Sequence, residues 1–461
     1  MGQGTSVFFR VVLTMILALG LSSQVYGKAK AAPPDQKGPY NVGIRTIDNV
    51  PMSGGRLARV QLFYPTSAPA DCDTKYTIIG VGGSFERSSP LCAVQNAAPA
   101  AGLFPLVVYN HGGNAAGVDA QRIAQMPLQE LMASHGFIVI VQRHSANNVA
   151  RVVDTSLLLD FALSAGNPVA ASIDSERIGL SGFSAGGRAA LAATSGWAAQ
   201  GIAADPRFKA MVLYEPSRDN TLEEIASLAI PYLIMGGTRM VSGIVTMPEI
   251  FETTVNASPR ILVQTPNALH FSYQSDLCLA IEETREAALA LDPNQVEPLV
   301  NMITPTTPNC LIDPTTGACV RACNSAAMSA PAIQACTYWN QGELFSVLVA
   351  RAFGGGRNIC DKVGTSPDSN RSLDTDPADG LTDEFLGGDP LIALFEGNDV
   401  WNSDASHDEP PPNYDTMQPV LENYTIGFFK KFLEGEGSYM KYLTPGYAQV
   451  HDLPANVDIR E

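Results

Sequence analysis

Short runs of branched apolar residues alternate with longer amphipathic segments over the first half of the chain. The runs at 106–109 and 137–142 are apolar without interruption, which is typical of strands buried on both faces of a parallel sheet. The remaining expected elements are strands at 59–64, 76–81, 178–180, 210–214, 232–235 and 261–263, and helices at 121–134, 152–163 and 188–193. This alternation predicts the α/β class, with a mainly parallel central sheet flanked by helices on both faces.

The regular alternation stops after residue 271 and returns only near the C-terminus. Between them, two separate helices are expected at 282–291 and 344–353. Residues 354–416 are rich in Gly, Asp, Asn and Pro, which predicts long loops. In 420–433 apolar residues recur every three or four positions, so a helix with one buried face is expected there, ended by Gly435.

This pattern predicts a core at 28–271, an insertion at 272–416 that forms a lid or cap, and a C-terminal helix and tail of the core at 417–461. The insertion would stand before the last helix of a single catalytic domain. A separate small domain at 272–416 is the alternative.

The N-terminus has the layout of a secretory signal peptide. Arg10 precedes an apolar run at 11–21, and Val25-Tyr26-Gly27 offers small or modest residues for cleavage. The run is shorter than the roughly 20 apolar residues that span a bilayer. We expect 1–27 to be removed near Gly27 and the protein to be secreted or periplasmic, with an uncleaved anchor as the alternative.

Charge narrows the range of partners. The chain has 46 acidic and 29 basic residues and a formal net charge of −17, so it repels phosphate backbones and anionic lipids. We expect no nucleic-acid partner and no membrane span in the mature chain. A neutral or cationic small-molecule or polymeric substrate fits this charge, and the sequence leaves the oligomeric state open.

The eight cysteines indicate disulfides, because their number is even and the chain is expected to be exported. Cys72 and Cys92 flank a short apolar stretch and are predicted to pair. The other six lie between 278 and 360, and their pairing cannot be deduced from sequence. A zinc site is not expected, since there is no C-x-x-C motif and the six histidines are scattered.

The strongest chemical signal is the segment 182–187, Gly-Phe-Ser-Ala-Gly-Gly, between an expected strand and an expected helix. This is the context of a nucleophile elbow, in which a strained turn points the serine hydroxyl out of the sheet. Side chains at Gly182 and Gly186 would collide with neighbouring elements. We predict Ser184 as the nucleophile and the N–H of Ala185 as an oxyanion donor. An ordinary glycine-rich turn is the alternative.

A second glycine-rich segment, Asn110-His111-Gly112-Gly113-Asn114, follows the strand at 106–109. Glycines let the main chain approach a substrate carbonyl closely. We predict the N–H of Gly113 as the other oxyanion donor, with Asn114 next in preference, and expect His111 to be structural.

A serine hydroxyl needs a base to attack an acyl carbon at neutral pH, and in α/β-hydrolases the order along the chain is Ser, acid, His. His270 follows the strand at 261–263 and is the predicted base. His407, in an Asp-containing loop, is the alternative base.

The acid should orient the imidazole and stabilise the imidazolium. The strand at 232–235 is followed by Gly236-Gly237-Thr238-Arg239, which has no carboxylate. One strand earlier Glu215 precedes a rigid proline, so Glu215 is the predicted acid. Asp219 is the second choice, and an acid from the insertion is the third.

These motifs resemble the platelet-activating-factor acetylhydrolase, chlorophyllase and dienelactone-hydrolase-like branch of the α/β-hydrolases, over residues 40–271 and the helix near 424–433. The resemblance rests on 111–113, 182–187, Glu215-Pro216 and Leu269-His270-Phe271. It implies hydrolysis of carboxylic esters through an acyl-enzyme. In this branch the acid is commonly an aspartate, where this chain has Glu215. Exported polyester hydrolases are similar at the elbow, and they place an aspartate where this chain has Arg239.

Three other functions remain open on sequence alone. An amidase or peptidase, or an acyltransferase, could use the same triad, and a non-catalytic binding module could share the fold. No organic cofactor is implied.

Four carboxylates in an acidic segment form a weak calcium candidate: Asp374, Asp376, Asp379 and Asp383. Their spacing departs by one from that of the EF-hand loop. A solvated acidic loop is the alternative.

Overall fold

The computed structural model describes residues 32–80, 83–112, 122, 125–145, 147–238, 245–266, 268, 270–273 and 414–461. From Pro34 onward these residues belong to one compact unit. The predicted signal peptide and nearly all of the predicted insertion, with its six cysteines and the calcium candidate, lie outside the described residues.

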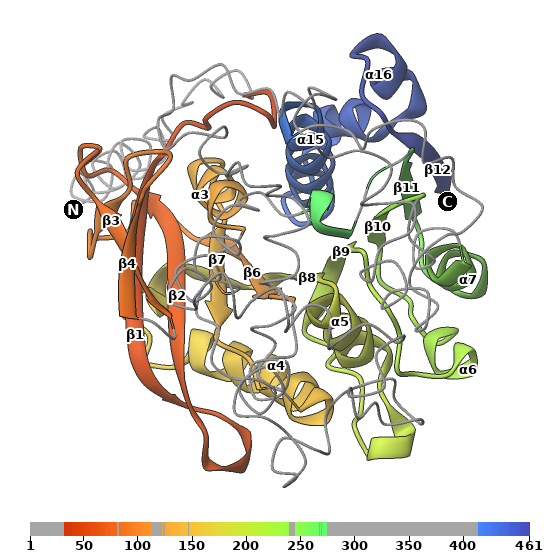
Figure 1. The fold of residues 1–461 in the computed structure, drawn as a ribbon, viewed down its shortest axis with the longest axis horizontal. Helices are drawn as coiled ribbons and strands as arrows, with labels where there is room; N and C mark the ends of the chain where they lie inside the picture. Colours follow the sequence, from red (N-terminus) through yellow and green to blue (C-terminus); the bar gives the residue numbers. More distant parts are fainter. Residues whose placement is uncertain are drawn as a thin grey trace, which may run out of the picture. The chain divides into compact units, whose positions relative to one another are not determined.

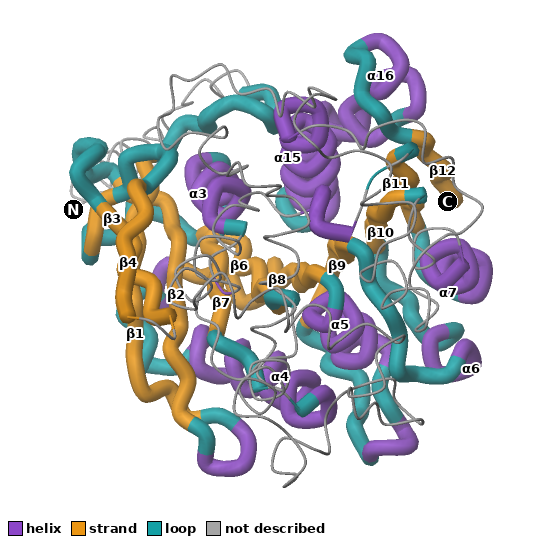
Figure 2. The backbone as a smooth tube through the Cα atoms, in the orientation of Figure 1, coloured by secondary structure: helices purple, strands orange, loops and turns teal. Residues whose placement is uncertain are grey.

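A large sheet forms the centre of this unit (Figures 1 and 2). Within the described residues it has ten strands in the order β12-β11-β10-β9-β8-β6-β7-β2-β1-β5. The strands are β1 (Asn41–Pro51), β2 (Leu57–Thr66), β5 (Val94–Gln95), β6 (Phe104–Asn110), β7 (Ile138–Gln142), β8 (Ile173–Phe183), β9 (Phe208–Tyr214), β10 (Tyr232–Gly237), β11 (Arg260–Thr265) and β12 (Asn456–Arg460).

The central strands are parallel from β7 through β6, β8, β9 and β10 to β11, whereas β2 runs antiparallel to β7 and to β1. The order β1-β2-β7-β6-β8-β9-β10-β11, with helices on both faces, is an α/β-hydrolase fold. The predicted fold class is thereby confirmed. All predicted strands are present within the described residues.

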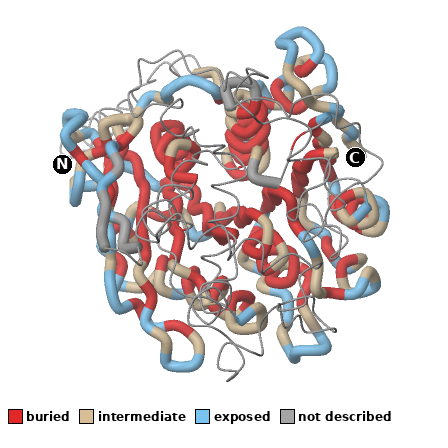
Figure 3. Tube along the Cα trace, viewed as in Figure 1, coloured by how far each residue is buried: buried red, intermediate tan, exposed pale blue. Residues whose placement is uncertain are grey.

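Helices cover both faces, and each face has its own apolar core. The core residues of α3 (Met126–Ser134) and α15 (Tyr414–Phe432) pack with one set of strand residues, and those of α4 (Asn148–Leu163), α5 (Ala185–Ser195) and α7 (Met247–Thr253) with the other. Along β6, Val107 and Tyr109 face the first core, whereas Leu106 and Val108 face the second, as the two-residue period of a strand requires. Figure 3 shows the central strands of the sheet as buried.

Local sequence signals set the helix boundaries. The side chain of Asn147 accepts the N–H of Ala150 at the start of α4, and Thr221 and Glu224 form a capping box at α6 (Leu222–Ile225). After α3 the chain turns at Gly136, whose φ is 100°. That conformation is open to glycine at little cost.

The C-terminal segment adds structure that the sequence pattern did not predict. After α15 come a 3-10 turn, η7 (Gly437–Leu443), the helix α16 (Pro445–Val450) and strand β12. β12 pairs antiparallel with β11, so that Ile459 lies opposite Ile261. The helix predicted as the last one is therefore followed by a further helix and by an edge strand of the sheet.

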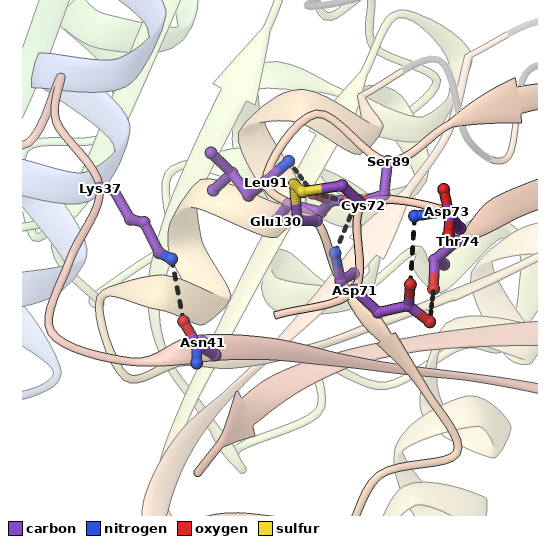
Figure 4. The surroundings of a disulfide bond; sticks show 11 residues. Lys37, Asn41, Asp71, Cys72, Asp73, Thr74, Ser89, Leu91 and Glu130 are labelled. Atoms are coloured by element: carbon purple, nitrogen blue, oxygen red, sulfur yellow. Dashed lines mark hydrogen bonds between the residues drawn. A yellow bond between two sulfur atoms is a disulfide. The ribbon is translucent and has the colours of Figure 1, made fainter. Parts of the chain in front are cut away.

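Cys72 and Cys92 form a disulfide, as predicted. The bond closes a segment that contains the hairpin of β3 (Lys75–Gly80) and β4 (Gly83–Ser88). Figure 4 shows that Glu130 of α3 lies beside this disulfide.

The buried carboxylate of Glu130 accepts hydrogen bonds from the hydroxyls of Tyr76 and Ser89 and from the N–H of Leu91. Burial raises the pKa of Glu130 to about 7. The hairpin segment is thus attached to α3 through a carboxyl group that titrates near neutrality.

Candidate active site

Ser184 lies between the end of β8 and the start of α5. Its φ of 53° and ψ of −121° lie in a region that residues with a side chain seldom adopt. Its N–H donates to the carbonyl of Tyr214 at 2.9 Å, and its carbonyl accepts the N–H of Arg188 at 2.9 Å. The backbone is therefore held on both sides in the strained turn expected of a nucleophile elbow.

The glycines of the elbow are required by close packing. A Cβ at Gly182 would lie 2.5 Å from the carbonyl oxygen of Gly186, and a Cβ at Gly186 would collide with the backbone of Asn110. The collisions predicted from the sequence are confirmed. A Cβ at Gly112 would come within 3.3 Å of the Cβ of Ser184. The loop after β6 therefore lies directly against the nucleophile.

Ala185 is the first residue of α5, where the N–H groups of a helix are free of intrahelical partners. This position fits the predicted oxyanion role. Gly113 and Asn114 lie outside the described residues. Gly112, which precedes them, lies against Ser184. Nδ1 of His111 donates to the carbonyl of Gly112 at 2.7 Å, and its Nε2 accepts the N–H of His144 at 3.0 Å. Both ring nitrogens of His111 thus have backbone partners, as expected of a structural histidine.

Glu215 follows β9 immediately, and it too has a positive φ, of 44°. Its N–H donates to the carbonyl of Met235 at 2.8 Å, and its carboxylate accepts the N–H of Gly237 at the end of β10. Only 1% of the residue is exposed. A buried carboxylate fixed by a backbone donor is suited to orient an imidazole and to balance its charge.

His270 begins η5 (His270–Tyr273), the 3-10 turn that follows β11. Tyr273, at the other end of this turn, is fully buried. Burial and the charge of Glu215 raise the pKa of Tyr273 well above its ordinary value. The turn that carries the predicted base therefore lies close to the predicted acid.

The two candidate acids have different environments. Oδ1 of Asp219 accepts a hydrogen bond from Nη1 of Arg188 at 3.2 Å, and Nη2 of Arg188 also donates to Asn148 at 2.7 Å. Asp219 is thereby paired with a side chain of α5. Glu215 instead interacts with the end of β10, which contacts η5. This arrangement favours Glu215. His407, the alternative base, lies outside the described residues.

The motif search missed two residues of this region, Gln125 and Tyr273. The side chain of Gln125, which immediately precedes α3, donates to the carbonyl of Tyr273. Neither residue belongs to a motif, and 148 positions separate them in the sequence. No local pattern could have joined them.

No group of three or more His, Cys, Asp or Glu side chains able to hold a metal ion is found in the part of the chain that the structure describes. The four aspartates of the calcium candidate are not in that part. Across the same residues, no helix is both long enough and apolar enough to cross a membrane.

No protein-family model and no curated protein matches the chain. Among solved structures, the chain is similar to a ferulic acid esterase from Streptomyces cinnamoneus, with 16% identity, 94% of this chain and 98% of the other covered, and a TM-score of 0.48. A match at this level does not identify a function.

Proposed function

We propose that the protein is an exported serine hydrolase that cleaves carboxylic esters through an acyl-enzyme. The observation that carries the proposal is the strained backbone of Ser184 between β8 and α5. A conformation of this kind costs on the order of 1–3 kcal/mol and is typically kept where function requires it. Within the fold, we place the chain with the platelet-activating-factor acetylhydrolase-like branch on the motifs quoted above.

In the first step His270 takes the hydroxyl proton as Oγ of Ser184 attacks the ester carbonyl. Glu215 holds the imidazole orientation and balances the positive charge that develops. The N–H groups of Ala185 and Gly113 stabilise the oxyanion, and each such donor contributes roughly 10²–10³-fold to rate. His270 then protonates the leaving alcohol.

In the second step His270 activates water, which attacks the acyl-enzyme and releases the acid. The imidazole of His270 accepts or donates the proton in every transfer, so the cycle requires no organic cofactor. The buried position of Glu215 supports this scheme, because a charge out of contact with water acts more strongly on its neighbours.

The test uses purified mature protein and its Ser184→Ala variant. We expect a fluorophosphonate probe to label the wild type at Ser184 and to leave the variant unlabelled. A panel of chromogenic esters from acetyl to long acyl should be hydrolysed by the wild type alone, and it would define the acyl preference.

Absence of labelling and of hydrolysis in a folded wild type would overturn the proposal and favour a binding module. Labelling combined with turnover of amides rather than esters would indicate an amidase or peptidase. Transfer to an added alcohol in preference to water would indicate an acyltransferase. N-terminal sequencing of the exported protein tests removal of residues 1–27.

A further inference from the structure

Gln125 connects two parts of the candidate site that are far apart in the sequence. Its side-chain Nε2 donates to the carbonyl of Tyr273 at 2.5 Å, and the same side chain shares a hydrogen bond with the phenol of Tyr109. Only 1% of Gln125 is exposed. A buried hydrogen bond of this kind is costly to break, because each partner would remain unsatisfied away from water.

The position of Gln125 on α3 indicates that its side chain serves tertiary contacts. It is the N-cap residue of α3, a position that favours Ser, Thr, Asp or Asn because their short side chains bond to the first N–H groups of the helix. The side chain of Gln125 makes no such bond. The backbone is still anchored, since the carbonyl of Gln125 accepts the N–H of Gln129 at 2.9 Å.

The two contacts lie next to the proposed chemistry. Tyr109 is followed by Asn110, His111 and Gly112, the segment that packs against the elbow. Tyr273 ends the four-residue turn that begins with His270. In so short a turn, a displacement of the Tyr273 carbonyl must be transmitted to the backbone of His270.

The other end of the base-bearing turn is held by a different contact. The backbone of Ala268 packs so tightly on Gly237 that a Cβ at Gly237 would collide with the Ala268 carbonyl. Gly237 is also the residue whose N–H donates to Glu215. The turn is thus fixed upstream against the acid and downstream by Gln125.

We propose that Gln125 is a positioning residue, which holds the turn carrying His270 at a fixed place relative to strand β6 and the elbow. The inference rests on the proposed function. Because Gln125 acts through the Tyr273 carbonyl, its loss should slow chemistry without weakening substrate binding. Displacement of a catalytic group by about 1 Å can cost on the order of 10²-fold in rate.

Gln129 provides a matched control, one helical turn further along α3. It is likewise 1% exposed, and neither polar atom of its side chain has a hydrogen-bond partner among the residues described. Gln→Met is close to volume-conserving at both positions. Gln129→Met therefore removes the same amide from the same helix without removing a link to the site.

The experiment measures kcat, KM and the second-order rate of fluorophosphonate labelling for the wild type, Gln125→Met and Gln129→Met. We expect Gln125→Met to lower kcat and the labelling rate at least about tenfold, with KM within about twofold. Gln129→Met should stay within about twofold of the wild type in all three quantities.

A Gln125→Glu variant adds a second readout. An ionised carboxyl cannot donate to the Tyr273 carbonyl, whereas a protonated one can. The ratio of variant to wild-type kcat should therefore rise as pH falls, and this decides the question if Gln125→Met does not fold. An unlabelled wild type would refute the proposed function itself. A labelled wild type with Gln125→Met equal to Gln129→Met would refute only the role of Gln125. A Gln125→Glu ratio that is well below one and does not change with pH would do the same.

Discussion

Ser184 and Glu215 occupy equivalent positions on adjacent parallel strands. Each is the first residue after its strand, each has a positive φ, of 53° and 44°, and each donates its N–H to a carbonyl near the end of the next strand. Neighbouring strands lie about 4.8 Å apart, so the nucleophile and the predicted acid are separated by one strand spacing. The base-bearing turn follows β11, two strands beyond β9.

This relationship predicts a clear difference between the two candidate acids. Glu215→Gln should lower kcat roughly 10²–10⁴-fold, because the amide retains the bond from Gly237 but no longer balances the imidazolium. Asp219→Asn should change kcat only a few fold, since it alters the pair with Arg188. Steady-state kinetics on an ester substrate measure both, and the reverse ranking would make Asp219 the acid.

The assignment of the base can be tested in the same way. His270→Ala should reduce kcat by at least about 10³-fold, because Ser184 would lose its proton acceptor. His407→Ala should retain activity near that of the wild type. Both proteins are compared by circular dichroism to establish folding, and an inactive His407→Ala beside an active His270→Ala would reassign the base.

The packing at the elbow predicts an effect on stability. Gly186→Ala should lower the free energy of unfolding by about 1–3 kcal/mol or more, because the new Cβ would press on the backbone of Asn110 and His111. Gly446→Ala is the control, since that glycine lies in α16 with open space where a Cβ would stand. Alanine there should be neutral or stabilise the protein by up to about 1 kcal/mol. Denaturant titration measures both, and equal effects would contradict the close packing.

Glu130 predicts a pH dependence of stability. Burial raises its pKa from 4.5 to about 7 in the folded state, so the folded protein holds this proton more tightly than the unfolded chain. The contribution of Glu130 is then fully present below about pH 4.5 and is lost as pH rises through about 7.

The difference in unfolding free energy between the wild type and Glu130→Gln, measured from pH 5 to 8, isolates this contribution from those of other groups. The wild type should lose stability relative to the variant by on the order of 3 kcal/mol over that range. A difference that does not change with pH would show that Glu130 keeps an ordinary pKa.

The sequence alone determined the central sheet and the strained turn at Ser184. β6 and β7 are buried on both faces, and strands of this kind are formed by uninterrupted apolar runs. Both runs can be recognised directly in the sequence. The elbow can also be recognised from the sequence, because only small residues fit at Gly182 and Gly186 beside Ser184. The pair Cys72 and Cys92 followed from their spacing and from the expectation of export.

Tertiary structure decided what depends on distant partners. β12 has a weak apolar pattern because it lies at the edge of the sheet, and it exists as a strand through its pairing with β11. Glu215 and Asp219 are both acidic residues in one loop, and only their burial and partners separate them. Gln125 resembles any glutamine near a helix start until folding brings the Tyr273 carbonyl to its amide. Local sequence shows which backbone conformations a segment prefers and how often its apolar residues recur. A contact between residues 148 positions apart forms only when the sheet and its helices assemble.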